Sequence, residues 1–322
     1  MKPKIFIIGA VVLLLLVVGF MIKDLFIDSP GNVNPYAFDL NSLRKGDTSQ
    51  CMYSEDQQIK PAGSEIHGIS TDASGNIYIS GKDTLEKLDS TGKVAWIKAY
   101  PGNAECIHVD EKGNIFLGME DHIELLDANG TKKAAWNSPS AEAVLTSIAT
   151  SGKDVFVADA GNKLVYRYDY LGNIELKIGQ KDPSTGVPGF IIPSPYFDLA
   201  MDPDGSLWVA NTGRHELEKY TREGKLISSW GKASMEVKGF CGCCNPSHFA
   251  IFPGGFVTAE KAIERVKIYD MKGNFVCLVA LPESFEEGTK GLDLAIGAQN
   301  AILVLDPVKN LVRKFIPKKK ES

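Results

Sequence analysis

The sequence predicts an all-β fold, a six-bladed β-propeller preceded by a single N-terminal transmembrane helix. Three observations lead to this prediction. An uninterrupted apolar run lies near the N-terminus, one phrase recurs six times with a period of about 40–50 residues, and 31 Gly and 16 Pro supply many turns. The 322 residues are 44% hydrophobic and 23% charged, which excludes disorder as the main state.

The apolar run covers residues 5–22 and follows Lys2 and Lys4. Its eighteen residues without a charge are just long enough to cross a bilayer as a helix. No small-residue cleavage pattern follows, so we favour an uncleaved signal anchor at 1–27 over a cleaved signal peptide. Because the lysines precede the run, we expect a single-pass protein of the cytoplasmic (inner) membrane with its body on the periplasmic side.

Three further segments complete the expected organisation. Residues 28–49 contain Pro30, Gly31 and Pro35 and are predicted to be a flexible linker. Residues 50–317 are predicted to be the propeller, and 318–322 a basic tail.

Each copy of the repeat contains an apolar strand, a Gly-bearing turn and two or more further strands. The copies run over 68–93, 107–130, 155–173, 201–220, 256–273 and 302–315. Their length is that of a four-stranded propeller blade. The sixth copy ends at Phe315 without its last strand. We therefore expect residues 50–59 to supply that strand and close the ring, which removes exposed strand edges.

These repeats resemble the NHL-repeat family of six-bladed propellers. The residues that carry the resemblance are 157–165 and 265–270, and it covers about residues 51–317. More narrowly, the phrases at 193–198 and 239–246 (Gly-Phe-Cys-Gly-Cys-Cys-Asn-Pro) are similar to those of bacterial membrane-anchored or exported NHL propellers of uncertain function. The resemblance implies a propeller that serves as a binding platform, and in some members as a lyase or hydrolase.

Function is expected where the copies stop resembling one another. Long loops at 180–196, 231–247 and 281–291 enter copies four, five and six on one face. The residue that begins the inner strand is ionisable in the same three copies; across all six copies it is Gly68, Cys106, Ser147, Asp198, His248 and Asp293. Carboxylates and an imidazole at one channel mouth predict a ligand or metal site at Asp198, His248 and Asp293.

Further candidates lie at the ends of the second strands, on the same face. These are Asp159, Asn211, Glu260 and Asp306, whose alternative role is to brace the following turn. Arg214 and His215 follow in the same kind of loop. Arg214 suits a carboxylate or phosphate ligand, or a bridge to an Asp of the propeller. Of these residues, Glu260, Arg214 and His215 join the predicted ligand-binding set.

Cys241, Cys243 and Cys244 form the least ordinary stretch of the chain. Three interpretations remain open. The thiolates together with His248 bind a soft metal ion such as Cu or Zn, or Cys241 and Cys244 are a redox pair, or some of the three form structural disulfides with Cys51, Cys106 or Cys277. A c-type haem site is excluded, because Asn245 stands where His would follow.

The formal net charge of −5 argues against a nucleic-acid partner. No nucleophile elbow, phosphate loop, H-E-x-x-H or Rossmann pattern is present, so no familiar motif supports catalysis. We therefore expect a membrane-anchored binding or scaffold module that takes a protein or small-molecule ligand on the face of copies four to six. The alternative is a metal-assisted enzyme, a lyase or hydrolase, or a metal- or redox-handling protein.

Overall fold

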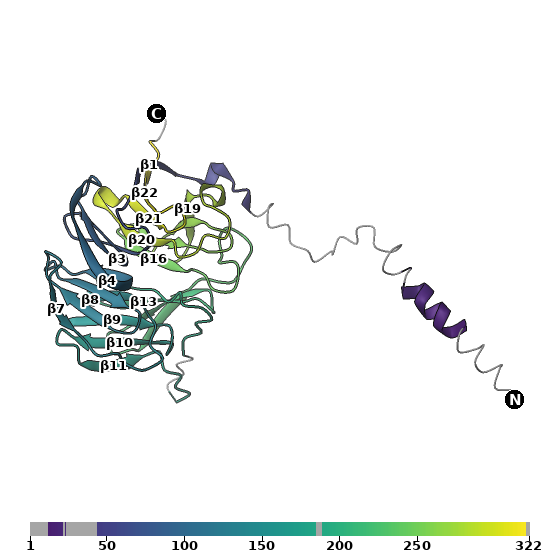
Figure 1. The fold of residues 1–322 in the computed structure, drawn as a ribbon, viewed down its shortest axis with the longest axis horizontal. Helices are drawn as coiled ribbons and strands as arrows, with labels where there is room; N and C mark the ends of the chain where they lie inside the picture. Colours follow the sequence, from purple (N-terminus) through teal and green to yellow (C-terminus); the bar gives the residue numbers. More distant parts are fainter. Residues whose placement is uncertain (1–11, 22, 24–43, 185–188, 320–322) are drawn as a thin grey trace. The chain divides into compact units, whose positions relative to one another are not determined.

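The computed structural model describes residues 12–21, 23, 44–184 and 189–319 (Figure 1). The chain divides into two compact units, residues 1–42 and 43–322. The described part of the first unit is an exposed helix at 12–21. The second unit is an all-β propeller.

The expectation of a transmembrane helix over residues 5–22 is corrected by this structure. The described helix has ten residues, whereas about 20 are needed to span a bilayer. Within the described part of the chain, no helix is long and apolar enough to cross a membrane. The rest of the predicted anchor, at 1–11, 22 and 24–27, and the linker up to residue 43 lie outside the described residues.

The strands of the propeller form five hydrogen-bonded sheets. Four sheets have four strands and one has six. The six-stranded sheet contains β2 (Ile66–Thr71), β3 (Ile77–Leu88), β4 (Val94–Val109), β5 (Ile115–Met119), β6 (Ile123–Leu126) and β7 (Lys132–Ala135). The second sheet contains β8 (Leu145–Ser151), β9 (Asp154–Asp159), β10 (Leu164–Asp169) and β11 (Ile174–Ile178).

The remaining three sheets complete the ring. The third contains β12 (Leu199–Met201), β13 (Leu207–Asn211), β14 (Glu216–Tyr220) and β15 (Leu226–Trp230). The fourth contains β16 (His248–Phe252), β17 (Gly255–Ala259), β18 (Val266–Tyr269) and β19 (Phe275–Ala280). The fifth contains β20 (Asp293–Ile296), β21 (Ile302–Asp306), β22 (Leu311–Pro317) and β1 (Tyr53–Ile59). Short 3-10 turns lie at Thr48–Gln50, Pro282–Ser284 and Ala298–Asn300.

The described residues therefore form five blades, and the expectation of six is wrong. The first two copies of the repeat share one sheet, because β4 is a continuous strand of 16 residues. Its first half pairs with β3 through Thr84 and Ala99, and its second half pairs with β5 through Ala104 and Met119. The Tyr100-Pro101-Gly102 segment predicts the end of a strand. However, Lys82 of β3 pairs with Asn103 of β4, so the β-ladder continues past this segment.

The prediction that an N-terminal strand closes the ring is confirmed. β1 pairs antiparallel with β22, with Tyr53 opposite Pro317 and Ile59 opposite Val312. Arg313 adds two charge-assisted hydrogen bonds to Glu55, at 2.9 and 2.6 Å. The last sheet is thus built from both ends of the propeller sequence.

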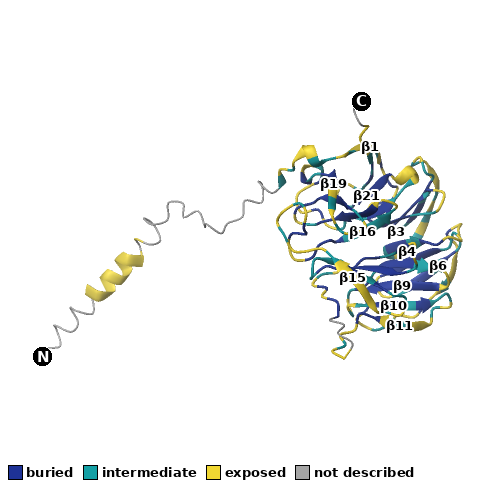
Figure 2. Cartoon of the chain, turned by 180° about the vertical axis from the view of Figure 1, so that it is seen from behind, coloured by how far each residue is buried: buried dark blue, intermediate teal, exposed yellow. Residues whose placement is uncertain are grey.

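The innermost strand segments surround a central channel. These segments are β2, the second half of β4, β8, β12, β16 and β20, which contact one another in that cyclic order. Apolar side chains pack between neighbouring sheets, and most residues of the inner strands are buried (dark blue in Figure 2). One such cluster joins β17, β18 and β21 through Val257, Val266, Ile302 and Val304. This burial holds the sheets edge-on around the channel.

Many turns between strands share one pattern, in which an Asp carboxylate accepts backbone N–H groups of the same turn. At Asp110 the carboxylate accepts hydrogen bonds from the backbone N–H groups of Lys112 and Asn114, at 2.9 and 2.8 Å. Gly113 in the same turn has a φ of 79°, a conformation that side chains other than glycine rarely adopt. The equivalent bonds in other turns are made by Asp72, Asp89, Asp127, Asp169 and Asp270.

Candidate functional site

The first channel-facing residues of the inner strands occupy equivalent positions. Gly68 pairs with Ser80, Cys106 with Gly118, Ser147 with Ala158, His248 with Ala259 and Asp293 with Leu305. The carbonyl of Asp198 accepts the N–H of Ala210 at the matching place. We call Gly68, Cys106, Ser147, Asp198, His248 and Asp293 the ring residues.

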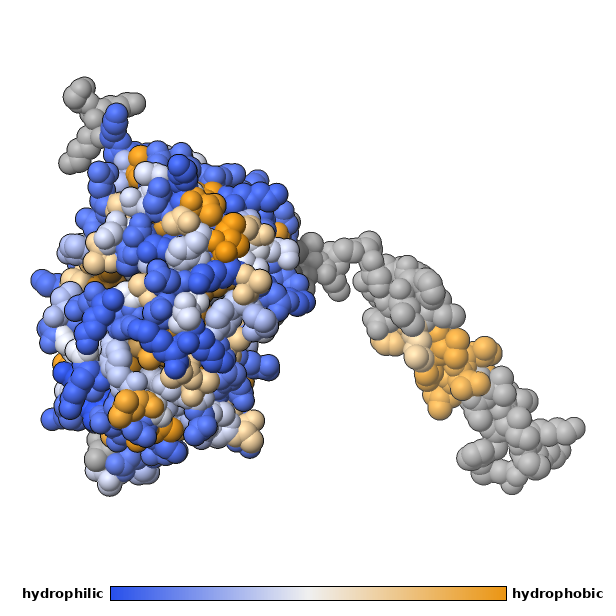
Figure 3. Space-filling view, turned by 60° about the vertical axis from the view of Figure 1, so that its left-hand side comes forward, coloured by the Kyte–Doolittle hydropathy of each residue, from blue (hydrophilic) through white to orange (hydrophobic). Residues whose placement is uncertain are grey.

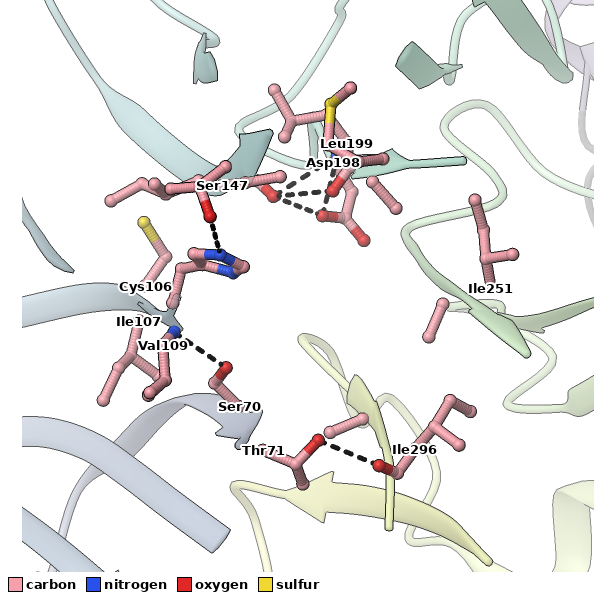
Figure 4. A pocket seen from close by; sticks show the side chains of 18 of the residues that line it. Ser70, Thr71, Cys106, Ile107, Val109, Ser147, Asp198, Leu199, Ile251 and Ile296 are labelled. Atoms are coloured by element: carbon pink, nitrogen blue, oxygen red, sulfur yellow. Dashed lines mark hydrogen bonds between the residues drawn. The ribbon is translucent and has the colours of Figure 1, made fainter. Parts of the chain in front are cut away.

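Ring residues line two cavities. The larger, of about 670 Å³, lies along the inner strands and is called the channel pocket; its lining includes Ser70 and Asp198, which Figure 4 labels, together with His108 and Asp293. The smaller, of about 390 Å³, is called the mouth pocket; its lining includes His67, Glu105, Tyr196, His248 and Lys290. Residues of the long loops before copies four and six, Tyr196 and Lys290, thus lie at the mouth, as the sequence predicts.

Asp198 lies just before β12 and links three consecutive inner strands. Its Oδ1 accepts a hydrogen bond from the Ser147 hydroxyl at 2.6 Å, which Figure 4 shows, and its Oδ2 accepts the backbone N–H of Phe249 at 2.8 Å. The residue is only 7% exposed. Part of its role is therefore structural, because it joins β8 and β16 through one carboxylate.

His248 lies between two carboxylates at the start of β16. Its Nδ1 is 3.7 Å from Asp198 Oδ2 and 3.4 Å from Asp293 Oδ1. Asp293 in turn accepts the backbone N–H groups of Ile69 and Leu294, at 2.9 and 2.7 Å. The His248 side chain keeps 15% of its surface exposed and lines the mouth pocket. Tyr196 packs edge-on against its ring at 6.0 Å between centroids.

We call Asp198, His248 and Asp293 the triad. One ligand atom from each residue lies within 4.8 Å of the others, a spacing that can hold a metal ion. Among the described residues, the triad is the one group of three His, Cys, Asp or Glu side chains with this property. Two carboxylates and one imidazole suit a divalent cation of the Mn²⁺ or Zn²⁺ kind.

Burial and mutual charge shift the proton affinity of the triad. Burial raises the pKa of Asp198 to about 6; the neighbouring charge of Asp293 also raises it, while His248 and the Ser147 hydrogen bond oppose the rise. Burial alone would lower the pKa of His248, but the contact with Asp293 and the charge of Asp198 raise it above its usual value. Asp198 and His248 therefore bind protons more readily than the isolated side chains would.

The other predicted ligand residues lie away from the triad in local contacts. Arg214 Nε is 4.0 Å from Glu218 Oε1, and His215 Nε2 lies 2.6 Å from the carbonyl oxygen of Gly242. Glu260 is buried and forms ion pairs with Arg265, at 3.0 Å, and with Lys267. The structure thus places Glu260 in a buried charge network and His215 against the cysteine loop.

Of the four strand-end residues, Asp159 and Asp306 brace the following turn, as their alternative role predicts, while Asn211 holds the loop that precedes its own strands. Asp159 accepts the backbone N–H groups of Val144 and Asn162, at 3.0 and 3.1 Å. Asn211 accepts that of Ile191 at 2.9 Å. Asp306 does the same for Lys309 at 3.1 Å.

The three loop cysteines separate into two environments. Cys241 is buried, and both its N–H and its thiol contact Glu260 Oε2, at 3.2 and 3.4 Å. Burial and then the charge of Glu260 raise the pKa of Cys241 to about 11. All six cysteines lie within the described ranges and are free thiols, so no pair forms a disulfide in this structure.

Cys243 and Cys244 form a close pair, and neither is among the residues that line the mouth pocket. Cys243 is exposed, Cys244 is buried, and their sulfurs are 3.1 Å apart. The structure does not group these thiols with His248, which contacts the two carboxylates instead. Burial tends to raise the pKa of Cys244, but a hydrogen bond with Ser194, the contact with Cys243 and the charge of Lys261 together lower it.

Sequence reasoning did not select Tyr196, Lys261 or Lys267 as site residues. Lys261 Nζ lies 4.5 Å from the centre of the Tyr196 ring and 3.2 Å from the Ser194 hydroxyl, so its side chain contacts the long loop at 180–196. Lys267 is buried and donates to the carbonyls of Val237 and Gly239, at 3.1 and 2.6 Å. The available signal for Lys261 was its place directly after Glu260, at a strand end on the loop-bearing face.

Comparison with known proteins supports the fold. No family model matches this sequence, and no curated protein matches it either. The chain is similar to a solved streptogramin B lyase, with a TM-score of 0.57, 12% identity, and coverage of 83% of this chain and 98% of that one.

Two further solved structures have the same level of similarity. For virginiamycin B lyase from Staphylococcus aureus the TM-score is 0.54 and the identity 14%, over 84% of this chain and 90% of that chain. For the WD40 β-propeller domain of Doa1 the values are 0.55 and 12%, over 79% of each chain. At these identities the likeness shows a β-propeller and nothing finer.

Proposed function

We propose that this protein is a binding module that takes its ligand into the mouth pocket, with a divalent cation held by the triad at the base of that pocket. The β-propeller fold fits a binding or scaffold role. The observation that carries the proposal is the triad itself, whose three ligand atoms lie within 4.8 Å of one another. His248 lines the mouth pocket, while Asp198 and Asp293 line the channel pocket.

The charge of the mouth supports a cation. Glu105 and Glu120 line the mouth pocket, and Lys290 is the one Lys or Arg among its lining residues. Asp198 and Asp293 add two carboxylates in the channel pocket. A bound cation would offset this excess of carboxylate and could accept an oxygen donor from a small molecule or a partner protein as a further ligand. In the view of Figure 3 the propeller surface is mostly hydrophilic with small apolar patches, which favours recognition in a pocket over a broad apolar interface.

The test uses Mn²⁺ and Zn²⁺ alone as probes of the full-length protein, by titration calorimetry. We expect one ion to bind per chain and the His248→Ala variant to lose at least about tenfold in affinity. His67→Ala is the matched control, because His67 lines the same pocket outside the triad. Absence of binding to the parent protein, or an equal loss in both variants, would contradict the proposal.

A metal-assisted enzyme is the second candidate, and one observation favours it. Nδ1 of His248 faces two carboxylates while part of the ring is open to the mouth pocket, an arrangement in which an imidazole can act as an acid or base. A catalytically inactive variant of virginiamycin B lyase from Staphylococcus aureus has been solved with quinupristin. Conversion of quinupristin by the Mn²⁺-loaded parent but not by His248→Ala, followed by chromatography, would favour this candidate.

A location on the periplasmic side of the inner membrane remains part of the proposal. It is supported by Lys2 and Lys4 before the apolar run at 5–22. It requires only that the N-terminal segment directs export, which a cleaved signal peptide also does. Membership of the NHL-repeat family is likewise proposed, on the residues at 157–165 and 265–270.

A further inference from the structure

The cysteine loop contains one thiol that is committed to internal packing. Cys241 is 3% exposed and contacts Glu260 through both its N–H and its sulfur. Arg265 Nη2 lies 3.6 Å from the same sulfur. The Cys241 sulfur therefore contacts the Glu260 carboxylate and the Arg265 guanidinium, and these contacts hold it away from the other two cysteines.

Cys243 and Cys244 form a separate pair, which we call the dithiol. Their sulfurs are 3.1 Å apart, and Cys243 is open to solvent. The chain directly after the pair is fixed, because Asn245 accepts the backbone N–H of Lys261 at 2.9 Å and donates to its carbonyl at 3.0 Å. The dithiol therefore lies on a loop that is held in place by the hydrogen bonds between Asn245 and Lys261.

A positive charge lies beside the dithiol. The Lys261 ammonium interacts with the Cys244 thiol and is held by the Ser194 hydroxyl at 3.2 Å. It also lies over the ring of Tyr196 at 4.5 Å. An anionic complex formed at the two sulfurs would therefore have a counter-charge already in place.

We propose that Cys243 and Cys244 bind one soft monovalent metal ion of the Cu(I) or Ag(I) class through their two thiolates. Each thiol releases one proton on binding, and the metal ion does not change oxidation state. Two thiolates and one monovalent cation leave a charge of −1, which Lys261 offsets. The exposed Cys243 side chain rotates away from Cys244 to make room for the metal ion.

The number of donors selects the metal. A structural Zn²⁺ site needs four protein ligands. Among the described residues, Cys243 and Cys244 gain no third ligand from His, Cys, Asp or Glu, since Cys241 contacts Glu260 and His248 belongs to the triad. Thiolate sulfur favours Cu(I), which accepts a low coordination number. The dithiol is therefore a different site from the triad, and it favours softer metal ions than the triad does.

The experiment titrates reduced full-length protein with Cu(I) without oxygen, in competition with the chromogenic chelator bicinchoninate. We expect one Cu(I) per chain, and at least a tenfold loss of affinity in Cys243→Ser and in Cys244→Ser. The matched control is the double variant Cys51→Ser and Cys277→Ser, a second pair of interacting thiols remote in sequence from the loop. That control keeps the site, and circular dichroism checks the fold of every variant.

Three outcomes would overturn the dithiol site. These are no Cu(I) binding to the reduced parent, unchanged binding in both single-serine variants, and a loss in the control equal to theirs. His248→Ala separates this inference from the proposed function, since it is expected to lose Mn²⁺ while keeping Cu(I). Loss of Cu(I) in a folded His248→Ala variant would also refute a site made of two thiolates alone.

Discussion

Asp198 is subject to opposing effects on its protonation. Its hydrogen bonds to Ser147 and to the N–H of Phe249 connect neighbouring inner strands, and these bonds favour the ionised form. Its burial and the nearby Asp293 favour the protonated form, and their effect is the larger. A side chain that connects the inner strands is thereby also one whose protonation changes near pH 6.

This balance predicts an unusual dependence of stability on pH in the metal-free protein. Because the pKa of Asp198 rises from 3.8 to about 6 on folding, the native state binds more protons between these values. The contribution is complete below about pH 4 and is lost as the pH rises through 6, and the raised pKa of His248 acts in the same sense. Urea unfolding in the presence of a chelator should show a loss of about 1–3 kcal/mol from pH 4 to pH 7 in the parent relative to Asp198→Asn.

The comparison of the parent with Asp198→Asn isolates the contribution of Asp198, because the other carboxylates are present in both proteins. Asp56→Asn is the control, because Asp56 is 40% exposed and belongs to β1, away from the ring residues. An Asp198→Asn protein with the same pH profile as the parent would contradict the raised pKa.

At the scale of the strand, β1 carries the closure of the ring. Ile59 is 6% exposed and packs in a cluster with Ile77, Leu88 and Val312. The strand therefore does more than cover an edge, because its last residue belongs to the core between the first and last sheets.

Ile59→Ala should lower the free energy of unfolding by about 2–4 kcal/mol, since it removes buried methyl groups and leaves a cavity. Ile97→Ala is the matched control, as it makes the same substitution on β4 at a side chain that is 49% exposed. We expect the control to stay within about 0.5 kcal/mol of the parent in urea denaturation. Similar losses in the two variants would show that β1 does not close the core.

The elements also show what the sequence can and cannot predict. The strands, the turns at Asp and Gly, and the closure by residues 50–59 follow from local patterns of alternation and turn chemistry. The number of blades could not be predicted in this way, because the continuity of β4 depends on the pairing of Lys82 with Asn103 across the Tyr100-Pro101-Gly102 segment, where the local pattern indicates a break. The triad could be predicted because equivalent strand positions face one channel. The split between Cys241 and the dithiol could not, since it depends on where Glu260 and Arg265 point.

At the scale of the whole molecule, the proposed location leads to a direct test. Alkaline phosphatase fused after Ser322 needs an oxidising compartment for activity, so an exported propeller should give an active fusion. A cytoplasmic reporter fused at the same place should then be inactive. The reverse pattern would exclude the periplasmic location and leave the binding and dithiol sites to be understood in a reducing compartment.

The way the ring closes has a mechanical consequence. Tyr53 lies opposite Pro317, so the chain enters and leaves the propeller at the same end of the β1–β22 pair. A pulling force applied between the two ends would load the hydrogen bonds of this pair one after another, as in a zipper, and not all at once as in shear. The ion pair between Glu55 and Arg313 is near the opening of this zipper. A force between the N-terminal and C-terminal ends of the propeller would thus separate β1 from β22 before it opened any other sheet.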